Sequence, residues 1–369
     1  MKVTHLTEYT SPPVVGGSAT FAMQLSAALR KSGISELLIS RPSQPRLYQH
    51  SISPASGLDS SYLYAESRLT LHRLIRYLFQ RSSHIIVEGP FIGLLAWLHP
   101  ITSCTYIYHG PLYREYQSTR SLLNPSRFLL WVGFAIRYFL TFLMCIRARR
   151  IVVISTIMEE YLKQDMPMFS GKVLKTLPFY SRQETRLELC EADLAMLNYT
   201  EPKHDILICR RLVPRTGVLP FLDLLIQNRS TLSIGVTGAG PLAEGLSAIS
   251  SATDTIRYYG SVSDNLLQVL LASSNCMVMP SLELEGFGLV VLESIWQGTV
   301  PLVSRHSGAA EWLLPYLPGL VFEPTSYASF CESYAYAISC RRDILDTLIP
   351  LMDRFDPKYF VEELLSCHI

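Results

Sequence analysis

Two glutamates eight positions apart, Glu285 and Glu293, bracket the segment whose residues are best suited to chemistry. Between them, Gly286 and Gly288 flank a phenylalanine, after a strand-like apolar run and before a helical pattern. Glycines permit a tight turn with outward-pointing backbone N–H groups, and such groups at the start of a helix favour an anion or a hydroxyl-rich ligand. Either glutamate alone would more often be structural. The pair around a Gly-Phe-Gly turn predicts a ligand site.

Two series of strand-like runs and helical patterns would position this segment. The predicted strands are Lys2–Leu6, Glu36–Ser40, His84–Glu88, Cys104–His109, Arg150–Ser155 and Lys172–Leu177 in the first series, and Asp205–Cys209, Leu232–Thr237, Ile256–Tyr259, Cys276–Met279, Val300–Ser304 and Leu320–Phe322 in the second. Helical patterns lie between them, at Thr20–Lys31, Leu219–Gln227, Asn265–Ala272 and Leu289–Gln297. This alternation predicts parallel sheets with helices on both faces. A pause near residue 180 predicts a hinge between two doubly wound α/β domains, with the ligand cleft between them.

The composition excludes several classes of protein. The 369 residues suit about two domains, and a hydrophobic share of 49% suits packed cores. A net charge of +1 argues against a nucleic-acid binder. None of the eight cysteines forms a CxxC pair, and most lie in apolar runs, so we expect reduced thiols and a cytoplasmic protein.

The segment Phe128–Ile146 is the most apolar part of the chain, with Arg137 as its single charge. It is nearly long enough to cross a bilayer, but a charge in mid-span is costly there. We therefore expect a mostly buried helix of an α/β domain. The alternative is an apolar face that contacts a membrane or a partner, which leaves a peripheral membrane association open.

The segment from Glu285 to Glu293 resembles the E-x7-E signature of the retaining glycosyltransferases of family 4, which have the GT-B fold. Further segments resemble motifs of that family in the same order along nearly the whole chain. They are Gly16-Gly17, His109-Gly110, Ile151–Ser155, Arg211–Gly217, Gly238–Leu242 and Gly308–Glu311. Each glycine match is weak, whereas their order and spacing together are strong. The resemblance implies an α/β protein with two Rossmann-like domains that face a cleft.

The resemblance also implies limits for the domains. We expect an N-terminal acceptor-side domain at 1–179 and a C-terminal nucleotide-sugar-binding domain at 180–348. A terminal helix within 349–369 would pack back on the N-terminal domain.

The resemblance implies that a hexose-type sugar is transferred with retention from a nucleotide-diphosphate-sugar to a glycan, lipid-linked or small-molecule acceptor. Catalytic roles fall to His109, Glu285 and Arg211. The donor would contact Gly16, Gly17, Arg211, Arg215, Thr216, Gly240, Phe287, Gly288, Leu289 and Glu293. In these roles Arg211 binds phosphate and Glu293 binds the ribose hydroxyls. Tyr113 and Arg114 would line the acceptor site, although they could equally be surface residues.

No Asp-x-Asp motif occurs, so we expect no metal and no cofactor, with arginines stabilising the leaving diphosphate instead. The sequence offers no candidate nucleophile for double displacement, and the resemblance implies a same-face substitution. One departure from the family is Thr216, where a lysine is usual; Arg215 or Arg210 would replace its charge. Two alternatives stay open, a nucleotide-sugar 2-epimerase of the same fold and a degenerate homologue that binds nucleotide-sugar without turnover.

Overall fold

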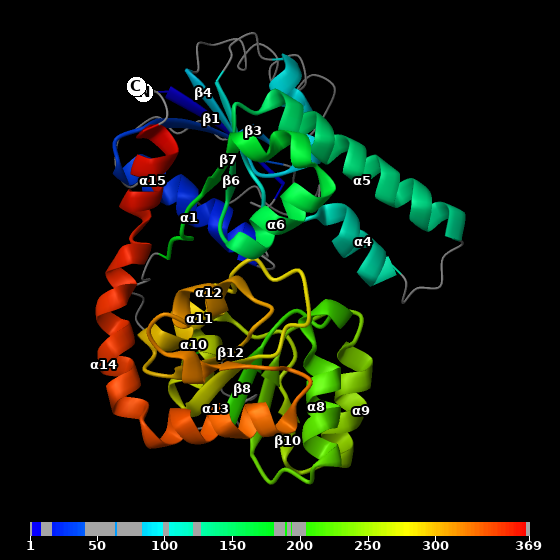
Figure 1. Ribbon diagram of the computed structural model, residues 1–369, viewed down its shortest axis with the longest axis vertical. Coiled ribbons are helices and arrows are strands. Elements are labelled where there is room, and N and C mark those ends of the chain that lie inside the picture. The colour runs from blue at the N-terminus through cyan, green and yellow to red at the C-terminus, as the bar shows by residue number, and fades with distance from the viewer. Residues whose placement is uncertain are drawn as a thin grey trace.

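The computed structural model describes residues 2–8, 17–40, 63–64, 83–98, 103–120, 127–180, 189, 193 and 204–366. Within them lie two parallel sheets, one in each half of the chain, with helices on both faces (Figure 1). This confirms the predicted class of two doubly wound α/β domains. Each predicted strand is present to within two residues at either end.

The N-terminal sheet has seven described strands in the order β3-β2-β1-β4-β5-β6-β7. Their bounds are β1 Lys2–Thr7, β2 Ser35–Ser40, β3 Leu63–Tyr64, β4 His84–Val87, β5 Cys104–Ile107, β6 Arg150–Val153 and β7 Val173–Lys175. The short edge strand β3 was not predicted. The helices described here are α1 Gly17–Lys31, α3 Pro90–Gly93, η1 Leu94–Leu98, α4 Leu112–Arg120, α5 Arg127–Arg147, α6 Thr156–Asp165 and η3 Pro167–Lys172.

The C-terminal sheet has six described strands in the order β10-β9-β8-β11-β12-β13. Their bounds are β8 His204–Cys209, β9 Ile234–Thr237, β10 Ile256–Tyr258, β11 Ser274–Met279, β12 Val300–Ser304 and β13 Val321–Phe322. The helices are η4 Pro214–Thr216, α8 Val218–Gln227, α9 Ala243–Ala252, α10 Asp264–Ala272, α11 Val290–Trp296, α12 Gly308–Leu313, η5 Pro318–Leu320, α13 Tyr327–Ser339, α14 Arg341–Leu351, η6 Met352–Phe355 and α15 Pro357–Leu365.

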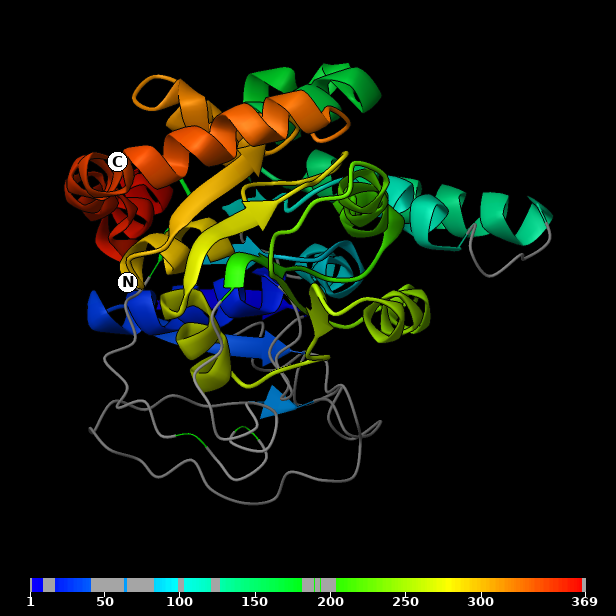
Figure 2. The same cartoon turned by 90° about the horizontal axis from the view of Figure 1, so that it is seen from below.

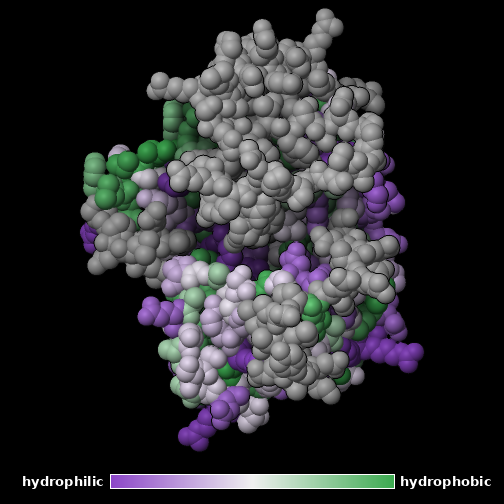
Figure 3. Space-filling view, turned by 180° about the vertical axis from the view of Figure 1, so that it is seen from behind, coloured by the Kyte–Doolittle hydropathy of each residue, from purple (hydrophilic) through white to green (hydrophobic). Residues whose placement is uncertain are grey.

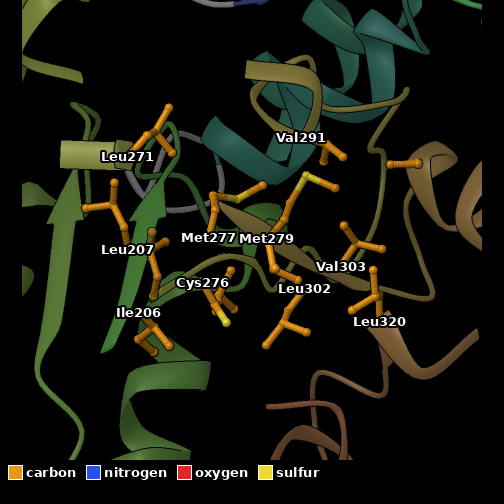
Figure 4. Packing of buried hydrophobic residues seen from close by; sticks show 14 of the residues in the cluster. Ile206, Leu207, Leu271, Cys276, Met277, Met279, Val291, Leu302, Val303 and Leu320 are labelled. Atoms are coloured by element: carbon orange, nitrogen blue, oxygen red, sulfur yellow. The ribbon is translucent and has the colours of Figure 1, made fainter. Parts of the chain in front are cut away.

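Each sheet is the centre of a hydrophobic core. In the C-terminal half, Leu207, Met277 and Leu302 come from three adjacent strands and belong to one large cluster (Figure 4). In the N-terminal half, alternate residues of one strand enter different cores: Ile85 packs with α5 and α6 side chains, whereas Ile86 packs with those of α1 and α15. Both faces are buried, because helices cover a parallel sheet on both sides.

Contacts join the two halves at several places. The last helices run from the C-terminal half along one side of the molecule to α1 (Figure 1), where Phe360 packs edge-on against Phe21. The Glu311 carboxylate of α12 accepts the backbone N–H groups of Thr156 (2.9 Å) and Ile157 (3.0 Å), at the start of α6. The carboxylate thereby satisfies two N–H groups that have no partner within their own helix.

The prediction of a mostly buried helix at 128–146 is wrong. The segment is helical, as α5, but only 17% of its most apolar window is buried. Phe128 is 70% exposed and Trp131 is 66% exposed. Apolar periodicity indicates a helix, but when nearly every position is apolar it does not indicate which face is covered. Within the described residues, α5 is the one helix long and apolar enough to meet the length and composition test for a membrane span.

Candidate functional site

The site lies between the two halves, where loops after strands of both sheets meet. His109 follows β5, Arg210 and Arg211 follow β8, and the Gly286 loop follows β11. A Cβ atom added to Gly286 would lie 3.6 Å from the backbone oxygen of His109 and 3.4 Å from Cδ1 of Ile154. The glycine loop of the C-terminal half therefore lies directly against the end of β5. The fold brings together two segments that are about 180 positions apart in the sequence.

The loop from Leu284 to Leu289 is a strained turn that contains backbone N–H groups without a described partner. Leu284 has a φ of 55° and Gly288 has a φ of 90°. A Cβ atom at Gly288 would lie 2.4 Å from Sδ of Met279, so a larger residue does not fit. Among the described residues, none accepts a hydrogen bond from the N–H groups of Phe287, Gly288 or Leu289. That these amides bind the oxygens of a ligand stays a prediction.

Phe287 itself contributes only its backbone to this loop. Its side chain is 2% exposed and packs against Trp312 and Phe355 in the C-terminal core. The aromatic ring therefore anchors the loop and leaves the neighbouring glycines at the surface of the site.

The carboxylate of Glu285 is held in place by Arg210. The Arg210 guanidinium forms an ion pair with Glu285 and donates to the Ser281 hydroxyl at 3.1 Å. The backbone of Glu285 bridges to Ser307, and its oxygen accepts the N–H of Gly308. A charge-assisted contact of this kind holds the carboxylate in one orientation.

Three arginines, Arg210, Arg211 and Arg215, lie close together beside the glutamates. Burial and then the charges of Arg215 and Arg211 lower the pKa of Arg210 to about 9, so it still carries its charge at neutral pH. Burial also lowers the pKa of Arg215. Arg211 is the most accessible of the three, with 49% of its side chain exposed. Like charges held this close repel each other, and a bound anion would relieve the repulsion.

A carboxylate from the other half of the molecule already lies against these arginines. Glu115 of α4 is 3.2 Å from the Arg215 guanidinium and 3.7 Å from that of Arg211. Nothing in the sequence pattern singled out Glu115, because the contact joins two domains. The Glu115 carboxylate forms the same kind of ion pair with these arginines that a phosphate group would form.

Thr216 and Gly240 shape the loops beside the arginines. The Thr216 hydroxyl is buried and donates within its own loop, to the backbone oxygens of Arg211 (2.8 Å) and Val213 (2.7 Å). Gly240 has a φ of 156°, and a Cβ atom there would lie 2.3 Å from the backbone oxygen of Leu212. Both residues hold the Arg211 loop in shape, and direct contact of either with a ligand stays a prediction.

Glu293 lies partly buried in the first turn of α11. Burial and then the negative charge of Asp264 raise the pKa of its carboxyl to about 7. None of the described residues forms a hydrogen bond with this carboxyl group, and its contact with a ligand stays a prediction. A buried polar group without a partner is costly, and sites of this kind are often functional.

His109 is the last member of a buried chain of hydrogen-bonded, ionisable side chains. Its Nε2 atom is 2.9 Å from Glu88, whose second oxygen is 2.6 Å from Nε2 of His5. His5 Nδ1 is in turn 2.8 Å from Glu36. A carboxylate accepts, so Nε2 of His109 donates, and in the neutral ring Nδ1 carries no proton. Glu88 thus selects the tautomer of His109.

The charges of this buried chain follow from its pKa shifts. Burial alone would lower the pKa of His5, but the charge of Glu88 and hydrogen bonds to both carboxylates outweigh burial and raise it to about 9. Burial alone would raise the pKa of Glu88, but the charge of His5 and hydrogen bonds from both histidines hold it below its usual value. His5 is therefore a buried imidazolium between two carboxylates at neutral pH.

Sequence reasoning missed Glu36, His5 and Glu88. The available signal was a polar residue in each of three strand-like runs. A single polar residue in a strand pattern usually indicates a side chain exposed to solvent. The three residues meet only because β1 lies between β2 and β4 in the sheet.

The predicted acceptor residues occupy different environments. Tyr113 is 1% exposed, and its hydroxyl donates to Asp165. Arg114 also pairs with Asp165, and 34% of its side chain is exposed. Gly17 is the first residue of α1, whereas Gly16 lies outside the described residues.

Two cavities of about 350 Å³ each are lined by residues from both halves of the chain. One is lined by Phe287, Gly308 and Glu311, and neither is lined by Arg211, Glu285 or Glu293. The arginines and the Glu285 carboxylate thus lie outside both cavity linings. Among the described residues, no group of three His, Cys, Asp or Glu side chains could hold a metal ion; metal independence stays a prediction.

One known family matches the C-terminal half of the chain. Residues 194–349 match the model of the glycosyl transferases group 1. The match covers less than half of the chain and includes the arginines, the Glu285 loop and Glu293. No curated protein matches the sequence.

Similar solved structures extend the comparison over the whole chain. Sucrose-phosphate synthase from Thermosynechococcus elongatus is 17% identical, with a TM-score of 0.69 over 99% of this chain and 98% of that chain. HepE from Anabaena, in complex with UDP and glucose, is 13% identical, with a TM-score of 0.69 over 100% of both chains. The catalytic domain of starch synthase IV from Arabidopsis thaliana, bound to ADP and acarbose, is 13% identical, with a TM-score of 0.66 over 99% of this chain and 97% of that chain. The likeness shows that the fold is GT-B, and together with the domain match it supports a glycosyltransferase.

Proposed function

We propose that this protein is a retaining glycosyltransferase of family 4. It transfers a hexose-type sugar from a nucleotide-diphosphate-sugar to a glycan, glycolipid or small-molecule acceptor, without a metal. One observation carries the proposal: a cluster of arginines and a loop with unpaired amides lie beside an available carboxylate, facing a positioned histidine. Each of these groups matches one part of a nucleotide-sugar.

The donor would bind mainly to the C-terminal half. Arg211 and Arg215 suit the diphosphate, because guanidinium groups form charge-assisted hydrogen bonds to phosphate oxygens. The Glu293 carboxyl suits the ribose hydroxyls. Glu285, fixed by Arg210, would accept hydrogen bonds from hydroxyls of the donor sugar, and the amides of Phe287, Gly288 and Leu289 would donate to the same sugar.

The chemistry would depend on stabilising the leaving diphosphate. As the bond between the anomeric carbon and the phosphate oxygen breaks, negative charge grows on the diphosphate, and Arg211 and Arg215 stabilise that charge. In the same-face mechanism the acceptor oxygen bonds to the anomeric carbon, and its proton passes to the departing phosphate oxygen. His109, oriented by Glu88, would position the transferred sugar.

The test is turnover of a donor panel by the purified protein in the presence of EDTA. We expect slow release of nucleotide from one of a set of UDP-, GDP- and dTDP-sugars. UDP-glucose comes first, because HepE has been solved in complex with UDP-glucose. The anomer of the transferred sugar, read by NMR, should match that of the donor. Interconversion of donor sugars without nucleotide release would indicate the epimerase, and calorimetry without nucleotide binding would contradict both enzyme functions.

A further inference from the structure

The outer face of α5 is an exposed apolar surface. Leu129 and Ile136 are seven positions apart, and Trp131 and Phe139 are eight apart, spacings that return to one side of a helix. Their side chains are between 49% and 66% exposed, and Phe128 is exposed further still. The opposite side is buried through Gly133, Thr141, Met144 and Cys145. The helix thus has an inner face packed on the protein and an apolar outer face.

The α3–η1 segment packs beside α5 and adds three partly exposed apolar side chains. Phe91, Leu94 and Trp97 are each more than a third exposed. Arg147 of α5 donates from Nε to the backbone oxygen of Ala96 at 3.1 Å, which ties the two segments together. Figures 1 and 2 show α5 projecting beyond the N-terminal sheet, and the corresponding part of the space-filling view is rich in apolar side chains (Figure 3, left). An exposed apolar surface of this extent indicates an interaction site.

The charged residues of α5 and of the segments that flank it along the chain are all arginines. Residues 116–158 contain six arginines and no aspartate or glutamate. Arg127 is exposed at the first turn of α5, and Arg149 and Arg150 are exposed just beyond its last turn. The chain as a whole has a net charge of only +1, so the basic excess is local. An apolar stripe with arginines at its ends is complementary to a bilayer that contains anionic lipids.

The same geometry argues against a helix that crosses the bilayer. Arg137 lies halfway along α5, donates to the Gly133 oxygen at 3.0 Å and lies over the Tyr116 ring at 3.9 Å. The inner face of α5 is thus committed to α4 and the sheet. We propose that the outer face of α5, together with α3–η1, binds the surface of an anionic bilayer, with α5 lying parallel to the membrane.

Membrane binding would bring the site close to lipid-linked acceptors, a consequence that rests on the proposed function. α4 packs on the inner face of α5 through Tyr113, whose ring meets Phe134 and Tyr138 edge-on. The same helix carries Glu115 to the arginines of the site. Helix α4 therefore lies between α5 and the arginines of the site and contacts both.

Flotation with liposomes tests the membrane surface without requiring turnover. Full-length protein is mixed with vesicles of phosphatidylcholine alone or with phosphatidylglycerol added. We expect at least about tenfold more protein to float with the anionic vesicles, since opposite charge adds to apolar insertion. Trp131→Gln with Phe139→Gln should abolish flotation. Ile338→Gln with Ile349→Gln, two similarly exposed apolar residues on α13 and α14, serves as the matched control and should float as the parent does.

Two results would overturn the proposal. One is no flotation with either kind of vesicle while the protein is folded by circular dichroism. The other is a stable dimer in light scattering that Trp131→Gln with Phe139→Gln converts to monomer, which would assign the face to a second copy. Nucleotide release from a soluble donor reports separately on the proposed function and should be the same in both double variants.

Discussion

Two buried histidines in corresponding central strands have opposite chemistry. His5 on β1 lies between Glu36 and Glu88, and its pKa is raised to about 9. His204 on β8 hydrogen-bonds to the hydroxyls of Ser233 and Tyr259. Burial and then the charge of Arg257 lower its pKa to about 4. One histidine is a buried cation, and the other is neutral.

The two halves differ in where the charged residues next to the site lie. In the N-terminal half, the charged groups lie inside the sheet, and the chain of contacts ends at His109, beside the Gly286 loop. In the C-terminal half the histidine within the sheet is neutral, and the charges of Arg210, Arg211 and Glu285 lie in loops at the strand ends. Substitutions in the first network should therefore affect stability first, and those in the second should affect binding and turnover first.

The largest expected effect is on stability. His5→Gln should lower the free energy of unfolding by about 3–5 kcal/mol, since it leaves two buried carboxylates facing each other without a cation. His204→Gln, the matched control, should cost only about 1 kcal/mol for altered neutral hydrogen bonds. Urea denaturation at pH 7 measures both. Equal losses would break the contrast between the two histidines.

The pH dependence of these variants sharpens the same contrast. The folded pKa of His5 is raised, so its stabilisation is complete below about pH 6.5 and is lost as the pH rises through about 9. The folded pKa of His204 is lowered, so stability is lost as the pH falls from about 6.5 through about 4. His5→Gln should flatten the alkaline limb of the stability profile, and His204→Gln the acidic limb. A profile unchanged by either variant would contradict the assigned charges.

The next effect is on turnover. Arg211→Ala should raise the activation free energy for kcat/KM with the donor by about 2–4 kcal/mol, because the growing charge on the diphosphate loses a hydrogen-bond donor. Arg342→Ala, a highly exposed arginine on α14, is the control and should have unchanged kinetics. Unfolding temperatures of both variants should remain near that of the parent. An Arg211→Ala enzyme with full activity would remove Arg211 from the site.

Glu88→Gln tests the link between the buried network and the cleft. It should lower kcat about 10–100-fold with little change in KM, as partners that orient a functional group commonly do. A purely structural role would lower the melting temperature without altering the shape of the pH–rate profile. Kinetics well below the melting temperature distinguish the two, and an unaltered profile would leave Glu88 with a structural role alone.

Glu293→Gln should affect binding and stability in opposite directions. Nucleotide affinity should fall roughly tenfold, because the ribose hydroxyls lose a charged acceptor. The raised pKa of Glu293 means that its ionised form costs stability as the pH rises from about 4.5 through about 7. The variant should therefore be more stable than the parent at pH 8, by on the order of 1–3 kcal/mol. Calorimetry and thermal melts measure the two effects, and unchanged affinity would remove the ribose role.

The smallest expected effect concerns Glu115. Glu115→Gln should strengthen donor binding a few-fold, because a carboxylate that competes with the diphosphate for Arg211 and Arg215 is removed. Glu159→Gln on α6, which breaks an exposed pair with Lys163, is the control. Donor titration by calorimetry measures the change, and weaker binding in the Glu115 variant would show that Glu115 supports the donor site.

Much of the fold and part of the site could be predicted from sequence. The strands, the two-domain organisation and the Glu285 loop were visible, because strand patterns and glycine turns are local properties. Position 288 favours glycine for two reasons: its φ is positive, and a Cβ atom there would collide with the Met279 side chain. The exposure of α5 was predicted wrongly, since its sequence is apolar on all sides and only the packing of neighbours decides which side is covered.

The sequence alone determined the order of the strands along the chain, the loops that carry glycines and the local excess of arginine. The tertiary structure decided which polar residues meet. Glu36, His5, Glu88 and His109 come from four separate segments, and their pairing depends on the order of strands in a sheet. Glu115 reaches Arg215 only across the two domains. A pKa, an ion pair and an exposed face are properties of neighbours in space, which spacing along one chain does not specify.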